Sequence, residues 1–254
     1  IREGHATFVR PFPISIDVER YAALGREVSF EETFPELAAH TRDKLLLLGV
    51  DRLDYTKGIP HRIRLFEALL KKRPDLRGRA VYVQIGAPTR TAIGRYAALA
   101  EEVQEIVDDV NRKFATDAWL PIRYIPEHTD RDQLACLYRR ADACLVTPLH
   151  DGMNLVAKEY VAAHAGEAGT LCLSKFTGAS RELLEACLVN PYDVETSAEM
   201  LAQSLDLDAP LRAEAMTRMY QRIQAHDVYD WAFHVMRSLD DIARRHEASF
   251  FPGN

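Results

Sequence analysis

The chain has 254 residues, of which 47% are hydrophobic, and its formal net charge is −6. A chain of this length can bury a full core in one large or two small domains. The negative charge provides no overall positive field for nucleic acid or an anionic membrane, and no apolar run approaches the ~18 residues of a membrane span. The first residues show neither a Met nor a signal-peptide pattern, so we expect a cytoplasmic protein of which this sequence is an internal part.

The four cysteines lie in apolar segments and lack the Cys-x-x-Cys spacing of metal and redox sites. They are Cys136, Cys144, Cys172 and Cys187. We interpret them as small core residues of a cytosolic protein rather than as disulfides or metal ligands. The nine histidines form no cluster with ligand spacing, so the sequence predicts no structural metal.

The chain begins with an extended segment that prolines interrupt. Pro11 and Pro13 divide the apolar residues of 6–16, which predicts either an edge strand or a segment that enters from another domain. A helix is expected next, over 18–26.

From there on, short apolar runs alternate with segments in which apolar residues recur every three or four positions. The runs predict strands over 44–50, 79–85, 122–125, 143–147, 170–174 and 188–191. The periodic segments predict helices over 59–70, 93–114, 130–140, 155–163, 196–204, 210–225 and 228–247. Repeated strand–helix alternation is typical of an α/β fold with a doubly wound, mostly parallel, Rossmann-like sheet of about six strands.

The loop 51–58 follows the first predicted strand and carries two basic residues. Arg52 and Lys57 would lie at the carboxyl edge of the sheet, and both can bind phosphate, Arg through a fork of donors and Lys as a point charge. A solvated loop whose charges pair with Asp51 and Asp54 explains the same residues.

The stretch 151–159 follows the fourth predicted strand and leads into a helix. Gly152 predicts a tight turn, because Gly tolerates positive φ, and Asn154 is expected to cap the helix by accepting a hydrogen bond from a first-turn amide. The amides of the first turn then carry the positive end of the helix dipole and predict a phosphate site. These amides belong to Leu155, Val156 and Ala157.

Two carboxylates flank this helix start. Glu159 could accept hydrogen bonds from a vicinal diol such as a ribose, and Asp151 lies at the strand end where ligands of open α/β sheets bind. On spacing alone, an ordinary strand–turn–helix with solvated charges is an equal alternative.

Together these loops resemble those of the trehalose-6-phosphate synthase family, which are retaining glucosyltransferases of the GT-B type. The matching motifs are DRLDYTKG (51–58), PTR (88–90), EHTDR (127–131), LVTPLHDGMNLVAKEYVAA (145–163) and VNPYD (189–193). PFPISID (11–17) also resembles the crossover between the two domains of such enzymes. The resemblance implies that this chain is the C-terminal, donor-binding half.

The resemblance also implies substrates and roles. The donor would be UDP-glucose and the acceptor glucose 6-phosphate, without a metal or other cofactor. The donor-binding residues would be Arg52, Lys57, Thr129, Asp151, Gly152, Met153, Asn154, Leu155, Val156, Ala157, Lys158 and Glu159. Of these, the catalytic residues would be Arg52, Lys57 and Asp151, and Arg90 would bind the acceptor phosphate. The family mechanism needs no protein nucleophile, so Asp151 would hold hydroxyls of the donor glucose.

On this basis the chain divides into three parts. Residues 1–17 would be the interdomain crossover, 18–227 the nucleotide-sugar-binding domain, and 228–254 a helix that packs on a missing N-terminal domain. The last part is expected because Trp231 and Leu239 belong to an apolar helix face that the sheet domain leaves without a partner.

Two other functions are compatible with the same motifs. A relative with another acceptor, such as a glucosylglycerol-phosphate synthase or a pseudo-glycosyltransferase, would share these donor-side residues. A catalytically silent regulatory subunit need not keep all of them. Assembly into a homo-oligomer is left open. A dinucleotide-dependent dehydrogenase is poorly supported, because no G-x-G-x-x-G follows the strand 44–50.

Overall fold

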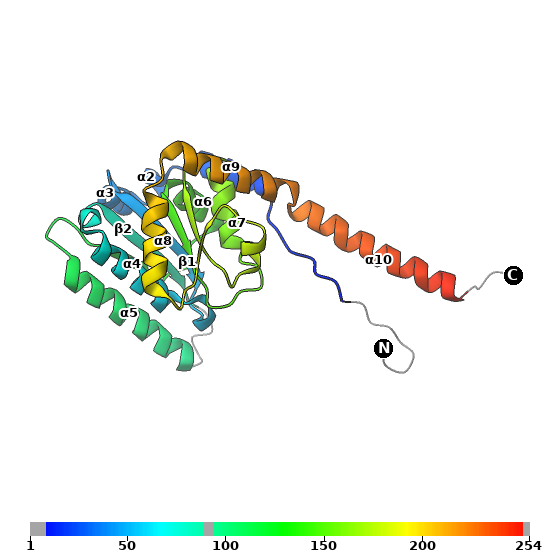
Figure 1. Cartoon of the computed structure of the whole chain (residues 1–254), viewed down its shortest axis with the longest axis horizontal. Coiled ribbons are helices and arrows are strands. Elements are labelled where there is room, and N and C mark those ends of the chain that lie inside the picture. Colours follow the sequence, from blue (N-terminus) through cyan, green and yellow to red (C-terminus); the bar gives the residue numbers. More distant parts are fainter. Residues whose placement is uncertain (1–8, 89–93, 251–254) are drawn as a thin grey trace.

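The structure is a computed structural model that describes residues 9–88 and 94–250, without the side chains of 94 and 245–250 (Figure 1). The strands are β1 Leu45–Arg52, β2 Ala80–Ala87, β3 Ile122–Ile125, β4 Ala143–Val146, β5 Thr170–Ser174 and β6 Cys187–Val189. They form one parallel sheet in the order β3-β2-β1-β4-β5-β6, which confirms the predicted doubly wound sheet of six strands. The strand order reverses between β1 and β4, and ligands of such sheets bind at this point.

Helices cover both faces of the sheet. On one face lie α4 Ile59–Lys72, α5 Gly94–Phe114 and α8 Val194–Leu205. On the other lie α1 Val18–Glu27, α6 Arg131–Arg140 and α7 Leu155–His164, with α9 Ala209–Ala225 packed against α1 and α7. This two-sided cover explains why the strands read as continuous apolar runs rather than as alternating patterns: Leu46, Leu47 and Leu48 of β1 have no exposed surface.

The sequence patterns missed several short helical turns. These are α2 Phe30–Thr33, α3 Pro35–Thr41, and the 3₁₀ turns η1 Tyr55–Lys57, η2 Pro74–Leu76 and η3 Gly178–Arg181. Each is too short for a helical period to show. Side chains cap the starts of α2, η1 and η3, whereas α3 and η2 begin at a proline. In η1, for example, Asp54 accepts a hydrogen bond from the amide of Thr56 at 2.9 Å.

The extended segment 9–17 is not a strand, so the edge-strand alternative is wrong. Its carbonyl groups bond to helices instead of to a sheet edge. The carbonyl of Ile16 accepts from the amide of Val228 at 3.0 Å, and that of Phe12 accepts from Nε1 of Trp231 at 3.1 Å. The segment therefore runs beside the start of α10 Val228–Phe250, which extends away from the sheet domain (Figure 1).

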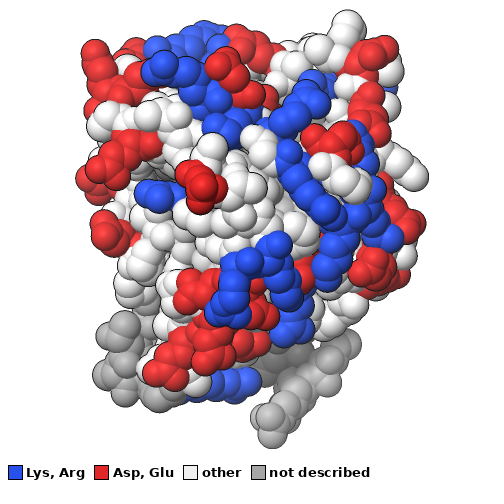
Figure 2. All heavy atoms as spheres, turned by 90° about the vertical axis from the view of Figure 1, so that its left-hand side faces the viewer, with Lys and Arg blue, Asp and Glu red and all other residues white. Residues whose placement is uncertain are grey.

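Acidic and basic side chains are interspersed on the face of the molecule that Figure 2 shows, rather than separated into regions of one sign. Along α10 the apolar face remains largely uncovered, and Leu239 is 57% exposed. None of the helices in the described ranges combines the length and the apolarity that a membrane crossing needs.

Candidate functional site

The loops that follow β1 and β4 meet at the point where the strand order reverses. The amide of Leu149 donates to the carbonyl of Thr56 at 2.8 Å, which ties one loop to the other. Gly58 ends the first loop with φ 63°, and a Cβ there would lie 3.0 Å from the carbonyl oxygen of Thr147. A residue other than Gly would thus meet both backbone strain and a close contact, so the tight approach of the two loops depends on Gly58.

Lys57 joins the two loops electrostatically. Its ammonium group lies 2.6 Å from Oδ2 of Asp151 and 3.8 Å from Oδ1 of Asp51, and the side chains of Lys57 and Asp151 are 18% and 17% exposed. Burial raises the pKa of Asp151, but the hydrogen bond and charge of Lys57, together with hydrogen bonds from Asn154 and the amide of Met153, outweigh it and hold the pKa below its usual value. Asp151 is therefore a charged acceptor at the edge of the sheet.

The start of α7 has the predicted cap but a different turn. Oδ1 of Asn154 accepts from the amide of Ala157 at 3.3 Å, which confirms Asn154 as the N-cap. The positive φ expected at Gly152 falls at Asn154 instead, with φ 75°. Oδ2 of Asp151 accepts from the side-chain amide of Asn154 at 3.1 Å, and this contact helps to hold that conformation.

This cap determines which amides can bind an anion. The amide of Ala157 is already used by Asn154, so the first-turn amides left without an intrahelical partner are those of Leu155 and Val156. Both residues are half-buried, and the helix dipole favours an anion at this position.

Glu159 is held by two tyrosines. Tyr21 of α1 donates to its Oε1 at 2.8 Å, and Tyr138 of α6 donates to its Oε2 at 2.9 Å. Burial raises the pKa of Glu159, whereas the two hydroxyls and the charge of Arg131 oppose that rise. The sequence patterns did not reveal either tyrosine, because both come from other helices.

The side chain of Lys158 is turned away from these loops. It is fully buried, and its ammonium group lies 2.7 Å from Oε2 of Glu182 and 3.1 Å from the carbonyl oxygen of Ile14. The side chain thus anchors the segment 9–17 to α7, and its charge is taken up by Glu182. This placement gives Lys158 no direct part in a phosphate site beside Asp151.

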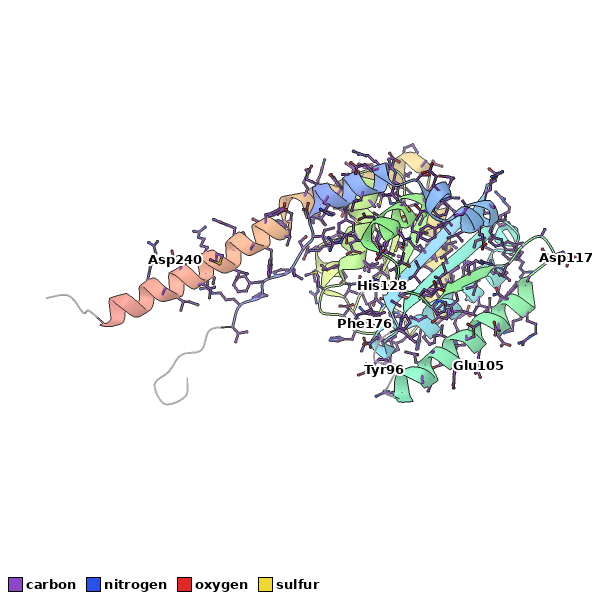
Figure 3. The ribbon with its side chains drawn as sticks, turned by 180° about the vertical axis from the view of Figure 1, so that it is seen from behind. Tyr96, Glu105, Asp117, His128, Phe176 and Asp240 are labelled. Atoms are coloured by element: carbon purple, nitrogen blue, oxygen red, sulfur yellow. The ribbon has the colours of Figure 1, made fainter. Side chains whose placement is uncertain are left out.

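Three of the remaining predicted residues lie in different settings. Arg52 is exposed at the end of β1 and, within the residues that the structure describes, has no ion-pair partner. Thr129 is 8% exposed in the loop between β3 and α6. Its neighbour His128 and Phe176, which follow β3 and β5, lie at the same end of the domain, opposite Asp117 (Figure 3). Arg90 lies outside the described residues.

A buried arginine below the two loops was not predicted. Arg62 of α4 has no exposed surface, and its guanidinium group donates to four acceptors. They are Oδ2 of Asp51 at 2.6 Å, Oγ1 of Thr147 at 3.0 Å, Oε1 of Gln84 at 3.2 Å and the carbonyl of Lys57 at 3.2 Å. We call Arg62 with these four residues the arginine hub. It connects the middle of β2 and the ends of β1 and β4 to the loop that carries Lys57.

Gly49 makes room for the arginine hub. A Cβ at this position would lie 2.6 Å from Oε1 of Gln84 and 3.0 Å from Nη1 of Arg62. Two signals in the sequence point to the hub in retrospect. Gly49 interrupts a run of leucines and valine, and Arg62 shares the apolar face of α4 with Ile59, Ile63 and Phe66.

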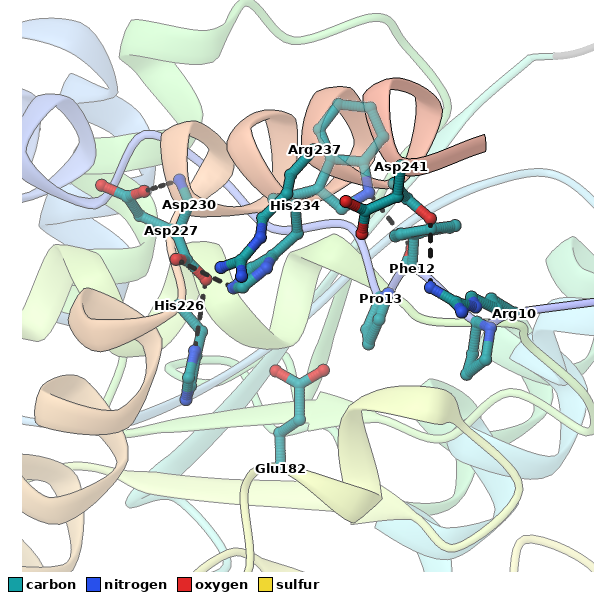
Figure 4. A pocket seen from close by; sticks show the side chains of 13 residues that line it. Arg10, Phe12, Pro13, Glu182, His226, Asp227, Asp230, His234, Arg237 and Asp241 are labelled. Carbon is teal, nitrogen blue, oxygen red and sulfur yellow. Dashed lines mark hydrogen bonds and ion pairs between the residues drawn. The ribbon is translucent and has the colours of Figure 1, made fainter. Parts of the chain in front are cut away.

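A cavity of about 570 Å³ lies elsewhere, between α10, the segment 9–17 and Glu182 (Figure 4). Its wall carries charges of both signs, including Arg10 and Asp230, beside the ring of Trp231. It includes none of the predicted donor-binding residues. The chemistry that the sequence predicts is therefore placed at the sheet edge rather than in this cavity.

Comparisons with known proteins find relatives over most of this chain. A model of glycosyltransferase family 20 matches residues 2–241. Trehalose-6-phosphate synthase of Sinorhizobium fredii is 40% identical over 229 residues, covering 90% of this chain and 49% of that protein. The UDP-forming alpha,alpha-trehalose-phosphate synthase of Candida albicans is 34% identical over 237 residues, covering 93% of this chain and 50% of that protein.

Solved structures show the same relationship. The UDP-forming alpha,alpha-trehalose-phosphate synthase of Burkholderia xenovorans, in complex with glucose-6-phosphate, has a TM-score of 0.87 and 37% identity, covering 90% of this chain and 51% of its own. Trehalose-6-phosphate synthase of E. coli, bound with UDP-2-fluoro glucose, has a TM-score of 0.86 and 35% identity, covering 90% and 50%. The chain spans about half the length of the curated relatives it matches.

Proposed function

This chain belongs to glycosyltransferase family 20, and we propose that it forms the donor-binding half of a retaining trehalose-6-phosphate synthase. The whole protein would transfer glucose from UDP-glucose to glucose 6-phosphate. The observation that carries the proposal is the meeting of two loops where the strand order reverses, which brings Arg52 and Lys57 to the same edge as Asp151 and the amides of α7.

Each group at this edge suits one part of the donor. Arg52 and the amides of Leu155 and Val156 present positive charge and unused donors to the diphosphate. Asp151 accepts hydrogen bonds and suits the glucose hydroxyls, and the Glu159 carboxylate suits the ribose diol. Thr129, from the loop after β3, would contact the uracil, as the family resemblance implies.

Catalysis would rest on stabilising the leaving diphosphate. The acceptor hydroxyl attacks the anomeric carbon from the side on which UDP departs, and the leaving phosphate takes its proton. Charge develops on the diphosphate as the glycosidic bond breaks, so fixed cations nearby lower the barrier. Lys57 is 2.6 Å from Asp151 and belongs to the loop that follows Arg52, so its charge can be shared between the carboxylate of Asp151 and the donor diphosphate. Asp151, already bonded to Lys57 and Asn154, is an orienting acceptor rather than a nucleophile.

We also propose that no metal cofactor takes part. The cations of Arg52 and Lys57 and the helix amides supply the positive charge that a metal gives other nucleotide-sugar enzymes. Addition of a chelator to the active whole protein tests this point, and a loss of turnover that magnesium or manganese restores would overturn it.

The test of the proposed function separates binding from transfer. Calorimetric titration should show that this chain binds UDP. UDP release from UDP-glucose with glucose 6-phosphate should be fast for the whole protein and far slower for these 254 residues, because positioning two sugars against each other is worth as much as ~7–11 kcal/mol. Glycerol 3-phosphate serves as the competing acceptor. Absence of UDP binding would refute the donor-binding role, and a preference for glycerol 3-phosphate would reassign the acceptor.

A further inference from the structure

Two tyrosine hydroxyls from different helices hold the two oxygens of one carboxylate near the start of α7. Tyr21 of α1 bonds to Oε1 of Glu159 and Tyr138 of α6 bonds to Oε2, at 2.8 and 2.9 Å. Tyr138 has no exposed surface and Tyr21 is 8% exposed, so neither ring is free to move. A carboxylate that is bonded at both oxygens to buried groups on separate helices has one fixed orientation. We call this arrangement the tyrosine clamp.

The tyrosine clamp leaves Glu159 able to accept further hydrogen bonds. An ionised carboxylate has about four acceptor positions, and the two tyrosines occupy one on each oxygen. Within the part of the chain that the structure describes, one position therefore remains on each oxygen, at a fixed separation and direction. Two adjacent hydroxyl groups, one per oxygen, are the complement of that pattern.

We propose that Tyr21 and Tyr138 are positioning residues that make this site prefer ribonucleotides to 2′-deoxyribonucleotides, by fixing the Glu159 carboxylate for both hydroxyls of a ribose. The inference rests on the proposed function, which puts Glu159 at the ribose. A fixed carboxylate cannot turn to compensate for a missing hydroxyl, so a bound 2′-deoxyribonucleotide leaves one carboxylate acceptor position unpaired. A freely rotating carboxylate would adapt and discriminate less.

The charges around Glu159 add a second consequence of the tyrosine clamp. Burial raises the pKa of Glu159, and the hydroxyls of Tyr21 and Tyr138 oppose the rise together with Arg131 of α6. Among the described residues, Cys144 of β4 also interacts electrostatically with Glu159, and burial raises the pKa of its thiol, which keeps it neutral. Removal of either hydroxyl should raise the pKa of Glu159 further, so nucleotide affinity should begin to fall at a higher pH on acidification.

The experiment measures dissociation constants of UDP and 2′-deoxy-UDP by calorimetry, with the intact chain and with Tyr21→Phe and Tyr138→Phe. Tyr160→Phe is the matched control, because the Tyr160 hydroxyl is equally buried on α7 but bonds to the backbone of Ala141 and Thr170. Thermal unfolding of each variant checks that it is folded. Glu159→Gln tests the ribose assignment itself.

The quantity compared is the dissociation constant of 2′-deoxy-UDP divided by that of UDP. We expect this ratio to fall roughly three- to tenfold in Tyr21→Phe and Tyr138→Phe, which is the size of one modest hydrogen bond, and to stay unchanged in Tyr160→Phe. The pH below which UDP affinity falls should be higher in Tyr21→Phe and Tyr138→Phe but not in Tyr160→Phe. Titration of the nucleotide itself affects all variants equally and cannot produce this difference.

Each other outcome has a separate meaning. An unchanged or increased ratio in both clamp variants, with a ratio that collapses in Glu159→Gln, would overturn the tyrosine clamp alone. An unchanged ratio in Glu159→Gln would overturn both the clamp and the assignment of Glu159 to the ribose. No binding of UDP by the intact chain would overturn the proposed function and the clamp with it.

Discussion

Replacement of Arg62 by Met is the sharpest test of the arginine hub. The substitution keeps an unbranched side chain but leaves the carboxylate of Asp51, whose side chain is 3% exposed, without its partner at 2.6 Å. The nearest remaining cation is Lys57, at 3.8 Å. Removal of one member of a buried ion pair costs about 3–5 kcal/mol, because it leaves a buried charge uncompensated. In a protein of this size that corresponds to a fall in Tm on the order of 10 °C.

The loss of folding stability caused by Arg62→Met should depend on pH, and the direction of this dependence can be predicted. Burial already raises the pKa of Asp51 above its usual value, although Arg62 and Lys57 oppose the rise. Without Arg62 the pKa rises further. A carboxyl group with a raised pKa in the folded state favours folding when it is protonated, so the cost of Arg62→Met should shrink as pH falls and grow as pH rises through the folded pKa.

Urea unfolding followed by circular dichroism at pH 7 and pH 5.5 measures both effects. Arg73→Met is the matched control, because Arg73 forms a 2.7 Å ion pair with the exposed Asp206, and such surface pairs contribute at most about 1 kcal/mol. The double variant Asp51→Asn with Arg62→Met should recover part of the lost stability. A variant Arg62→Met as stable as the control, or one that loses more stability in acid, would refute this account of the hub.

Three further substitutions test neighbouring features. Arg52→Ala should weaken UDP binding about ten- to a hundredfold, the loss of a charge-assisted hydrogen bond, and unchanged affinity in a calorimetric titration would remove Arg52 from the diphosphate site. Lys57→Met should raise the pKa of Asp151, because burial then acts on that carboxylate without its main opposing charge; NMR titration of the aspartate carboxyl carbons would show no change if the 2.6 Å pair does not persist in solution. Gly49→Ala should cost about 1–3 kcal/mol in urea unfolding, because the added methyl group meets the Tyr82 hydroxyl, and wild-type stability would show that the hub can yield.

Most of the fold could be predicted because apolar patterns within short segments of the sequence indicate its strands and helices. Buried strands of a parallel sheet are apolar along their whole length, so the run of leucines in β1 and the shorter run in β4 were both visible. The helices that cover the sheet show a three-to-four spacing, and α5 ends at Phe114 as that spacing predicts. The segment 9–17 was the ambiguous case, because extended residues with prolines fit a strand edge and a crossover equally well.

The site was predictable only where one short stretch builds it. The cap of α7 by Asn154 depends on neighbouring residues, and the sequence predicted it correctly. The position of the positive φ was wrong, because contacts to Asp151 rather than the intrinsic freedom of Gly152 set the turn. In the tyrosine clamp, Tyr21 is separated from Glu159 by 138 positions in the sequence, and Tyr138 is separated from it by 21 positions. No periodicity within one helix can reveal contacts that depend on how helices pack against each other.

The arginine hub also bears on the order in which the chain folds. Arg62 reaches Asp51 and Gln84 over 11 and 22 residues, but it reaches Thr147 over 85. The last of these contacts needs β4 to pair with β1, after the chain has passed through β2, α5, β3 and α6. Contacts between distant residues form late, because the entropy of closing a long loop must be offset first. We therefore expect the loop that carries Lys57 to reach its final geometry only when the two halves of the sheet join. During refolding, a fluorescent nucleotide should bind at that step and not when the helices first appear.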